Sequence, residues 1–444
     1  LIDEMLNQRV AFWNDYYELG LQIIEAESDL LPLYPYQQRA YDAADATKSG
    51  QIIIPTGGGK TWVQADVINN KVASEDGGKA IVVLTPRITL NTQQVEEYFL
   101  RLMAHGNRPY RFMCNHSSNM DDNFLRDIAE RKGISIPDYD FVATTDPDEI
   151  KKQWDLANEN GENLVIISTY HSADRISEAI GNVDFVTCDE AHYVASNQFY
   201  VDADDTSENN VRIQRVFDCP YHYHTATPRT RKDNLGMDNT RQDMFGEKFC
   251  EVSPLELIKG GYLTAPCLYT VTASDDPNSD AYKSDIAALI DVWNQHYEDT
   301  DYTSKLLVQA KSRRQIESMG QYIVENKSDF RAEPVVYRIS TSHNSGDNWG
   351  AYIEDRSVTK EEWISEVRSE ERDAIIIHYD MLSEGLDVPG ISGTTFFRAV
   401  GSTADPQDNR GLVKLIQILG RTMRILPEDR SKENIEDYTK KESF

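Results

Sequence analysis

Short, mostly apolar runs recur along the chain, and they alternate with longer polar stretches that have helical spacing. One series lies at 51–54, 80–84, 164–168 and 185–188, and a second lies at 305–309, 334–339, 374–378 and 394–399. Continuous apolar runs of this length are typical of strands buried on both faces. Because strands that alternate with helices form parallel sheets, the pattern predicts two α/β units in tandem.

The length of the chain agrees with two units. Single cores rarely grow beyond about 250 to 300 residues, and this chain has 444. Gly260, Gly261 and Pro266 mark a connector between the two series of apolar runs. We therefore predict a first domain at 32–255, a connector at 256–266 and a second domain at 267–444.

Two further segments do not follow the alternation of strands and helices. Residues 1–31 place Met5, Trp13 and Ile24 at roughly helical spacing before the first prolines, which predicts a helical N-terminal extension. The interval 101–163 is long for a connection, and we expect an insertion there.

Composition narrows the class of protein. Five cysteines without a C-x-x-C pair indicate a reducing compartment, so we expect an intracellular, cytoplasmic protein. The sequence contains no run of about 18 apolar residues, which is the length that a membrane-spanning helix needs, so no membrane span is predicted. The net charge of -29 argues against a broad basic surface, but it leaves a local basic track possible. We expect acidic runs such as 361–371 to be solvated.

The run at 51–54 leads into Pro55-Thr56-Gly57-Gly58-Gly59-Lys60-Thr61, a glycine loop followed by a helical pattern. Backbone N–H groups of such a loop turn toward phosphate oxygens, the lysine reaches the β- and γ-phosphates, and the threonine hydroxyl binds Mg²⁺. Ile54 replaces the first glycine of the general pattern. The sequence therefore predicts an ATP site built from Thr56, Gly57, Gly58, Gly59, Lys60 and Thr61.

The run at 185–188 leads into Asp189-Glu190-Ala191-His192. Open α/β sheets bind ligands at the carboxyl ends of their strands. Asp189 would hold Mg²⁺ there, and Glu190 would orient and deprotonate the attacking water. The types of Cys219, His222 and His224 also suit a metal, but their alternation into Thr225 favours a strand, and a fourth ligand is missing.

These motifs resemble those of superfamily 2 helicases of the DEAD/DEAH type, and further motifs of that family follow in the same order. They are Leu33-Tyr34-Pro35-Tyr36-Gln37, Thr85-Pro86-Arg87, Ser168-Thr169-Tyr170, Thr225-Ala226-Thr227, Glu384-Gly385-Leu386-Asp387-Val388-Pro389 and Gln417-Ile418-Leu419-Gly420-Arg421-Thr422-Met423-Arg424. Tyr34 departs from the arginine of the family pattern. Within the family, 144–150 and 166–172 are most similar to the restriction-subunit-like predicted helicases.

The resemblance implies two RecA-like domains and a role for each motif. Gln37 would read adenine, and the nucleotide would also be bound by Gly385 and Asp387. Coupling of hydrolysis to movement would involve His192, Thr225 and Thr227. The implied contacts to nucleic acid are Arg87, Thr169, Lys311 and Arg313, although Arg313 could equally be a solvated helix residue.

The last motif supplies positive charge. Arg421 and Arg424 are three residues apart and share one side of a helix, and Gln417 precedes Arg421 by four. From the second domain they could reach the nucleotide as arginine fingers. Catalysis is thus expected from Lys60, Asp189, Glu190, Gln417, Arg421 and Arg424.

The expected function is that of an ATP- and Mg²⁺-dependent helicase or translocase that acts on nucleic acid, with DNA favoured over RNA. An RNA helicase or remodelling ATPase is the alternative enzyme. A non-hydrolysing nucleic-acid-binding module is the alternative from another class, but it has no chemical need for a base and a finger together. We find no nuclease motif, and a nuclease or other domains or subunits could lie outside this chain.

Overall fold

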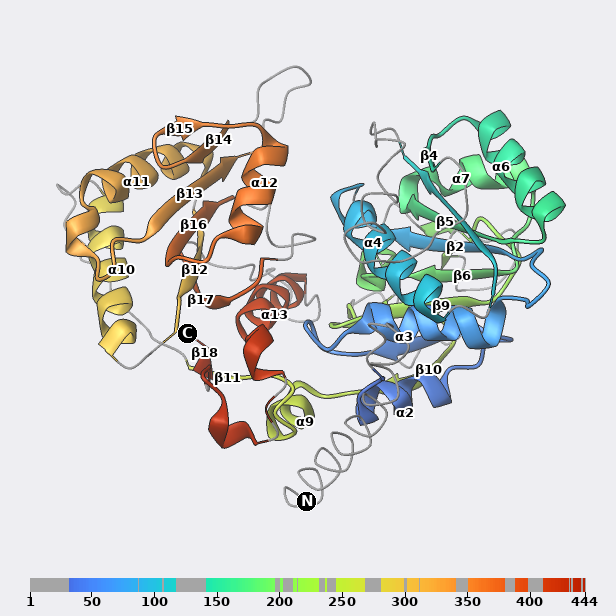
Figure 1. Cartoon of the computed structure of the whole chain (residues 1–444), viewed down its shortest axis with the longest axis horizontal. Coiled ribbons are helices and arrows are strands. Elements are labelled where there is room, and N and C mark those ends of the chain that lie inside the picture. Colours follow the sequence, from blue (N-terminus) through green and yellow to red (C-terminus); the bar gives the residue numbers. More distant parts are fainter. Residues whose placement is uncertain are drawn as a thin grey trace. The chain divides into compact units, whose positions relative to one another are not determined.

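The two series of apolar runs form two separate sheets in the computed structural model (Figure 1). The chain divides into two compact units, one ending at Ser253 and the other beginning at Pro254. The described residues are 32–86, 88–105, 108–116, 141–195, 200–202, 211–213, 215–230, 236–237, 245–267, 281–298, 302–310, 312–340, 350–379, 388–397, 410–430, 432, 434–440 and 442–443. The predicted helical extension at 1–31 lies outside them.

Unit 1 is built on an eight-stranded sheet in the order β10-β1-β9-β6-β2-β5-β3-β4. All of its neighbouring strands are parallel, as predicted. The strands are β1 (Gly50–Ile53), β2 (Ala80–Thr85), β3 (Tyr110–Asn115), β4 (Val142–Ala143), β5 (Asn163–Thr169), β6 (Phe185–Cys188), β9 (Tyr221–Thr225) and β10 (Glu247–Glu251). A separate antiparallel pair joins β7 (Tyr200–Asp202) and β8 (Val211–Ile213).

Helices precede or connect these strands. They are α2 (Pro35–Ala43), α3 (Lys60–Val67), α4 (Ile88–His105), α6 (Pro147–Asn160) and α7 (Ala173–Ile180), and α3 runs on into a π-helical turn at Ile68–Val72. The start of α6 shows how local residues determine where a helix begins. Pro147 occupies its first turn, and the Asp146 side chain accepts a hydrogen bond from the Asp148 N–H.

The expected insertion at 101–163 is wrong in part, because this interval supplies β3, β4 and α6 to the unit 1 sheet region. The sequence of β3 does not read as apolar, since it contains Arg111. The Arg111 guanidinium is buried and pairs with Glu162 at 2.7 Å and with Gln153 at 3.1 Å. Its charge is paired with residues far away in sequence, so the strand can contain this arginine without leaving an unpaired buried charge.

Unit 2 contains a mixed six-stranded sheet in the order β15-β14-β13-β16-β12-β17. Its strands are β12 (Lys305–Gln309), β13 (Val335–Ser340), β14 (Gly350–Ile353), β15 (Arg356–Ser357), β16 (Ala374–His378) and β17 (Ile391–Phe396). The four predicted strands are parallel to one another, and β14 and β15 add an antiparallel edge that was not predicted. The last predicted strand begins three residues earlier than expected.

The helices of unit 2 are α9 (Pro254–Lys259), α10 (Ala281–Glu298), α11 (Arg313–Glu325), α12 (Lys360–Ser369) and α13 (Arg410–Thr422). The predicted connector therefore contains most of a helix, α9. It also contains β11 (Ala265–Pro266), which pairs with β18 (Glu442–Ser443) near the end of the chain. Among the described residues, no helix has the length and apolar character needed to span a membrane.

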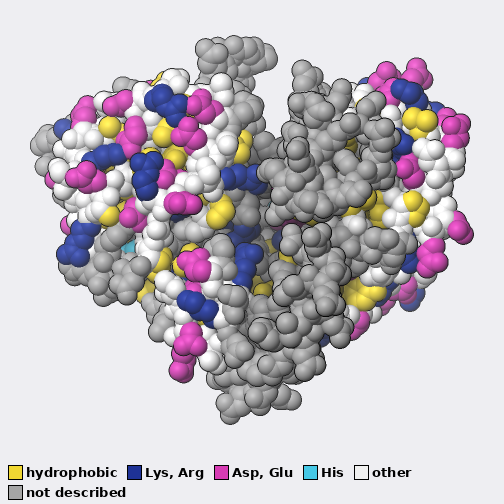
Figure 2. Space-filling view, viewed as in Figure 1, with side chains coloured by type: hydrophobic (Ala, Val, Ile, Leu, Met, Phe, Trp, Pro, Cys, Tyr) yellow, Lys and Arg dark blue, Asp and Glu magenta, His cyan; other side chains and the backbone are white. Residues whose placement is uncertain are grey.

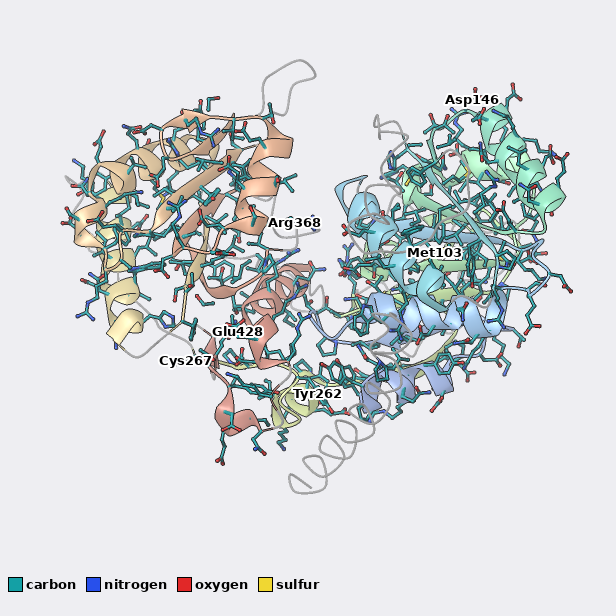
Figure 3. All side chains as sticks on the ribbon, in the orientation of Figure 1. Met103, Asp146, Tyr262, Cys267, Arg368 and Glu428 are labelled. Atoms are coloured by element: carbon teal, nitrogen blue, oxygen red, sulfur yellow. The ribbon has the colours of Figure 1, made fainter. Side chains whose placement is uncertain are left out.

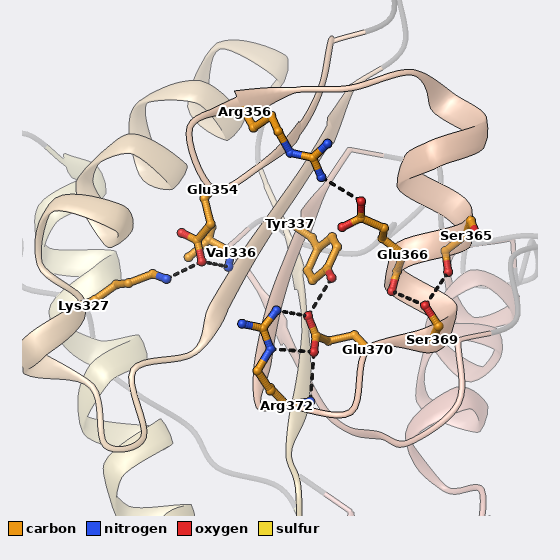
Figure 4. Close-up of polar contacts among 10 residues, drawn as sticks. All are labelled: Lys327, Val336, Tyr337, Glu354, Arg356, Ser365, Glu366, Ser369, Glu370 and Arg372. Atoms are coloured by element: carbon orange, nitrogen blue, oxygen red, sulfur yellow. Dashed lines mark hydrogen bonds and ion pairs between the residues drawn. The ribbon is translucent and has the colours of Figure 1, made fainter.

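The acidic run at 361–371 is not simply solvated. Arg356 pairs with Glu362 and, at 2.7 Å, with Glu366 on α12. Figure 4 shows the second of these contacts. Glu370 binds the Arg372 guanidinium at 2.8 Å and accepts a hydrogen bond from the Tyr337 hydroxyl. Basic and acidic side chains are likewise interspersed on the displayed face of unit 2 (Figure 2).

Buried histidines on β9 predict acid sensitivity of unit 1. His222 is fully buried, donates to the Asp45 carbonyl at 2.9 Å and contacts the rings of Phe185 and Phe249. Burial lowers the pKa of His222 from 6.5 to about 4. The unfolded chain therefore binds more protons between these values, and stability falls as pH decreases through this window.

We expect this residue alone to cost on the order of 3 kcal/mol of unfolding free energy by about pH 4. The substitution His222→Phe removes the titrating ring and should flatten the pH dependence measured by urea unfolding. The exposed His171→Phe serves as the control and should follow the parent chain. An unchanged slope in His222→Phe would contradict the assignment.

Candidate ATP site

The predicted ATP-site motifs of unit 1 meet at one edge of its sheet. Strands β1 and β6 flank β9, and all three are parallel. Their carboxyl ends therefore bring together the glycine loop after β1, Asp189 after β6 and Thr225 at the end of β9. Open parallel sheets bind ligands at this edge.

The glycine loop has the backbone of a phosphate cradle. Gly57 and Gly59 have φ values of 83° and 69°, which glycine adopts without strain. A Cβ at Gly59 would also lie 2.4 Å from the Gln37 side-chain nitrogen. Helix α3 begins directly afterwards at Lys60, so its N–H groups and positive end lie at the loop. The buried Thr56 hydroxyl has no hydrogen-bond partner among the described residues.

Gln37 lies against this loop. Its amide nitrogen donates to the Gly58 carbonyl at 3.0 Å, and its oxygen accepts from the Tyr34 N–H at 2.8 Å. The Tyr36 hydroxyl also donates to the Gly58 carbonyl at 3.0 Å. The motif at 33–37 thus holds the glycine loop in this structure, and a contact of Gln37 with adenine stays a prediction.

A chain of polar contacts runs from the loop to β9. The Lys60 ammonium lies 3.5 Å from one Glu190 oxygen, and His192 Nδ1 lies 3.3 Å from the other. The same His192 nitrogen lies 3.1 Å from the Thr225 hydroxyl. That hydroxyl in turn accepts from the Thr227 N–H at 3.2 Å. Five predicted site residues are therefore connected through side-chain and backbone contacts.

The other carboxylate, Asp189, is held by amides. It is 6% exposed, and its two oxygens accept from Gln64 at 3.2 Å and from Gln94 at 2.6 Å. The Tyr170 hydroxyl donates to its backbone carbonyl at 2.6 Å. The position of Asp189 is thus fixed from three different elements.

The two neighbouring carboxylates differ electrostatically. Burial, followed by the nearby Glu190 carboxylate, raises the pKa of Asp189 above its ordinary value. Burial also acts to raise the pKa of Glu190, but Lys60 and His192 together lower it by more, so this pKa lies well below its ordinary value. Glu190 is therefore ionised at neutral pH and suited to orient a water molecule.

The oxygen ligands present fit Mg²⁺ bound together with a nucleotide. Mg²⁺ in nucleotide sites takes one or two carboxylates plus substrate phosphates, and Asp189 and the half-buried Thr61 are hard oxygen ligands of that kind. Among the described residues, no group of three or more His, Cys, Asp or Glu side chains could hold a metal ion by itself.

The predicted nucleic-acid contacts are only partly described. Thr169 ends β5, is 7% exposed and lies 2.9 Å from the Ser172 hydroxyl. Arg313 begins α11, but its side chain lies outside the described residues. Arg87 and Lys311 are outside them altogether.

The predicted arginines belong to unit 2. Gln417 and Arg421 lie on α13 and are 5% and 9% exposed. Arg424 follows the helix and forms a bridge with Leu263. The other predicted nucleotide contacts in this unit, Gly385 and Asp387, lie outside the described residues.

A buried lysine that the sequence did not reveal fixes the end of α13. The Lys440 ammonium is fully buried and donates to the carbonyls of Thr422, Arg424 and Ile391, the last at 2.8 Å. Close by in sequence, the Tyr438 hydroxyl donates to the Gly261 carbonyl at 3.0 Å. The segment from Tyr262 to Cys267, whose two ends are labelled in Figure 3, is joined to the residue before Arg424 by the hydrogen bond from the Thr264 N–H to the Met423 carbonyl.

Comparisons with known proteins agree with this reading of the fold. The family described as "Type III restriction enzyme, res subunit" matches residues 30–230. No match was found among curated proteins. The ATP-dependent Type ISP restriction-modification enzyme LlaBIII, in a structure bound to DNA, is 19% identical with a TM-score of 0.56, and the match covers 89% of this chain and 27% of that one.

Two further structures are similar at lower TM-scores. A nuclease-deletion mutant of the Type ISP enzyme LlaGI, in complex with a DNA substrate mimic, is 23% identical with a TM-score of 0.36, covering 61% of this chain and 23% of that one. S. cerevisiae Dbp5, bound to RNA and ADP BeF3, is 15% identical with a TM-score of 0.48, covering 91% and 85%.

This chain therefore spans about a quarter of each Type ISP enzyme, with coverages of 27% and 23%. At 19% identity the similarity to LlaBIII shows the fold alone. Residues 30–230 match the res-subunit family model, and LlaBIII shares the tandem α/β fold; both findings support the resemblance of the ordered motifs to those of superfamily 2 helicases.

Proposed function

We propose that this chain is a nucleic-acid-dependent ATPase that uses ATP and Mg²⁺ to move on or unwind nucleic acid. The observation that carries the proposal is the arrangement of Lys60, Glu190 and His192 beside the glycine loop. A lysine beside a glycine loop and an ionised carboxylate next to it are groups that phosphoryl transfer uses, and His192 connects this carboxylate to β9. A binding module without hydrolysis has no need of Glu190.

In this mechanism, ATP phosphates compete with Glu190 for the Lys60 ammonium. Once Lys60 binds the β- and γ-phosphates, Glu190 loses its nearest cation, and its pKa rises toward the ordinary value. Glu190 then becomes a better acceptor for the proton of the attacking water. Mg²⁺, held by Asp189 and Thr61, would neutralise charge on the phosphates. Arg421 and Arg424 would supply positive charge for the transition state, supported by Gln417.

The remaining predicted residues complete the cycle. Gln37, Gly385 and Asp387 would bind the nucleotide. The contacts from Glu190 through His192 to Thr225 and Thr227 would transmit structural changes upon hydrolysis from the ATP site to the rest of unit 1. Arg87, Thr169, Lys311 and Arg313 would contact nucleic acid, chiefly its backbone, so sequence specificity should be low.

DNA is the favoured nucleic acid because residues 30–230 match the res subunit of Type III restriction enzymes. LlaBIII, which shares the fold, was solved bound to DNA. The motifs themselves do not distinguish DNA from RNA. Competition between single-stranded DNA, duplex DNA and RNA for the chain will decide this point, and preferential binding of RNA would favour an RNA helicase or remodelling ATPase.

Nucleic-acid binding should weaken steeply with salt despite the net charge of -29. A protein that follows the phosphate backbone releases counterions at each contact, so several contacts predict a loss on the order of 10³-fold in affinity between about 50 and 200 mM salt. Fluorescence anisotropy with labelled single-stranded DNA measures this slope. A constant affinity across that range would contradict binding through the backbone.

A further inference from the structure

One face of α4 is directed at the ATP site. Gln94, Tyr98 and Arg101 follow one another at spacings of four and three, which places them on the same side of the helix. All three side chains are buried. Their partners are Asp189, Gln64 and Asp66, which lie far away in sequence. The face therefore joins α4 to α3 and to the end of β6.

This face controls the orientation of Asp189 in two ways. Gln94 donates directly to one carboxylate oxygen at 2.6 Å. Tyr98 donates its hydroxyl to the Gln64 oxygen, which leaves the Gln64 amide nitrogen to donate to the other oxygen of Asp189 at 3.2 Å. Both oxygens of Asp189 thus accept hydrogen bonds that depend on α4.

The two polar atoms of the Gln94 side chain differ, because its nitrogen contacts Asp189 while its oxygen is unsatisfied among the described residues. The side chain is 4% exposed, so this oxygen is buried. A buried acceptor without a partner costs about 1–3 kcal/mol. An apolar side chain of similar volume would avoid that cost, but it would also leave one Asp189 oxygen without this donor, so the contact with Asp189 is what the glutamine contributes.

Helix α4 is joined to α3 at one end, and at the other end it follows the segment that we expect to contact nucleic acid. Arg101 binds both oxygens of Asp66 at 2.7 Å, and its guanidinium lies 4.9 Å from the centre of the Trp62 ring. At its other end, α4 follows Thr85-Pro86-Arg87, the segment to which we assign nucleic-acid contact. A displacement at the start of α4 would therefore reach Gln94 through a rigid helix, about two turns away.

We propose that Gln94 is a positioning residue that orients Asp189 for Mg²⁺ and couples nucleic-acid binding at the start of α4 to nucleotide binding. The inference rests on the proposed function. It adds a structural connection, through α4 and Gln94, between the nucleic-acid site and the nucleotide site. Residues that orient a metal ligand typically change metal affinity by about 10- to 100-fold when replaced. Coupling between two ligands is reciprocal, so it is measurable from either side.

The test compares the full chain with Gln94→Leu. We expect the free Mg²⁺ concentration for half-maximal binding of a fluorescent, non-hydrolysable ATP analogue to rise by about 10-fold or more. Excess Mg²⁺ should restore binding of the analogue. Single-stranded DNA should change the affinity of the parent chain for the analogue, and this change should shrink toward none in Gln94→Leu.

Gln153→Leu is the matched control. Gln153 is also a buried glutamine of unit 1, but its partners are Glu149 and Arg111. We expect it to lose stability in urea unfolding while keeping the Mg²⁺ requirement and the DNA effect. If Gln94→Leu keeps both as well, the inference is overturned. A parent chain that binds no nucleotide would overturn the proposed function too, so the two failures are distinguishable.

Discussion

Replacing Glu190 by glutamine will stop ATP turnover and leave ATP binding nearly intact. Glutamine keeps the size of the side chain, but its amide cannot accept the proton of the attacking water. Loss of a general base typically lowers turnover by about 10²- to 10⁴-fold. The ion pair with Lys60 at 3.5 Å is lost as well, which frees Lys60 for the phosphates. Phosphate release and binding of a fluorescent ATP analogue measure the two effects separately.

Lys60→Ala is the paired variant and should show the opposite pattern. The substitution removes the lysine that follows Gly59 in the glycine loop, and this side chain is 9% exposed and lies beside Glu190. ATP binding itself should weaken because the phosphates lose this positive charge. Turnover close to the parent rate in Glu190→Gln would remove Glu190 from the chemistry. Equal binding defects in the two variants would show that Glu190 acts in binding instead.

Arg421→Ala will reduce turnover on the order of 10³- to 10⁵-fold, as expected for the loss of an arginine finger. In the proposed mechanism the Arg421 charge acts in the transition state rather than in the bound state, so ATP affinity should fall far less. The measurement is the turnover rate at saturating ATP and nucleic acid, together with the affinity for the ATP analogue.

Arg372→Ala is the control for Arg421→Ala in the same unit. Arg372 is 73% exposed and pairs with Glu370 beside α12. Its loss should leave turnover at the parent rate. If Arg421→Ala behaved in the same way, the positive charge for the transition state would have to come from another residue, with Arg424 as the next candidate.

The sequence predicted strands best where they are buried on both faces. The run at 185–188 is entirely buried in β6, and its limits agree with the structure. Strand β3 was missed because Arg111 interrupts its apolar pattern, and the Glu162 that neutralises this charge is 51 residues away. The antiparallel strand β14 was missed for a similar reason, because it alternates buried and half-buried residues at the edge of the sheet.

In the candidate site, too, residues in local sequence patterns were predicted, whereas residues whose roles depend on long-range contacts were not. The loop at 56–61 and the carboxylates at 189–190 follow local patterns whose chemistry is evident from residue type and order. Gln94 has no such pattern, since a glutamine in a helix reads as a surface residue, and its partner Asp189 is 95 residues away. Lys440 also reads as a surface residue, although three carbonyl groups surround its ammonium. Both roles depend on tertiary packing.

ATP turnover by the full chain, measured with and without single-stranded DNA, tests the central claim most directly. We predict slow hydrolysis alone and a large increase with DNA, because closing a nucleotide site around its substrate excludes water and aligns the catalytic groups. The increase should disappear in Glu190→Gln. Hydrolysis that is absent under all conditions, or that neither DNA nor RNA changes, would contradict the assignment of this chain as a nucleic-acid-dependent ATPase.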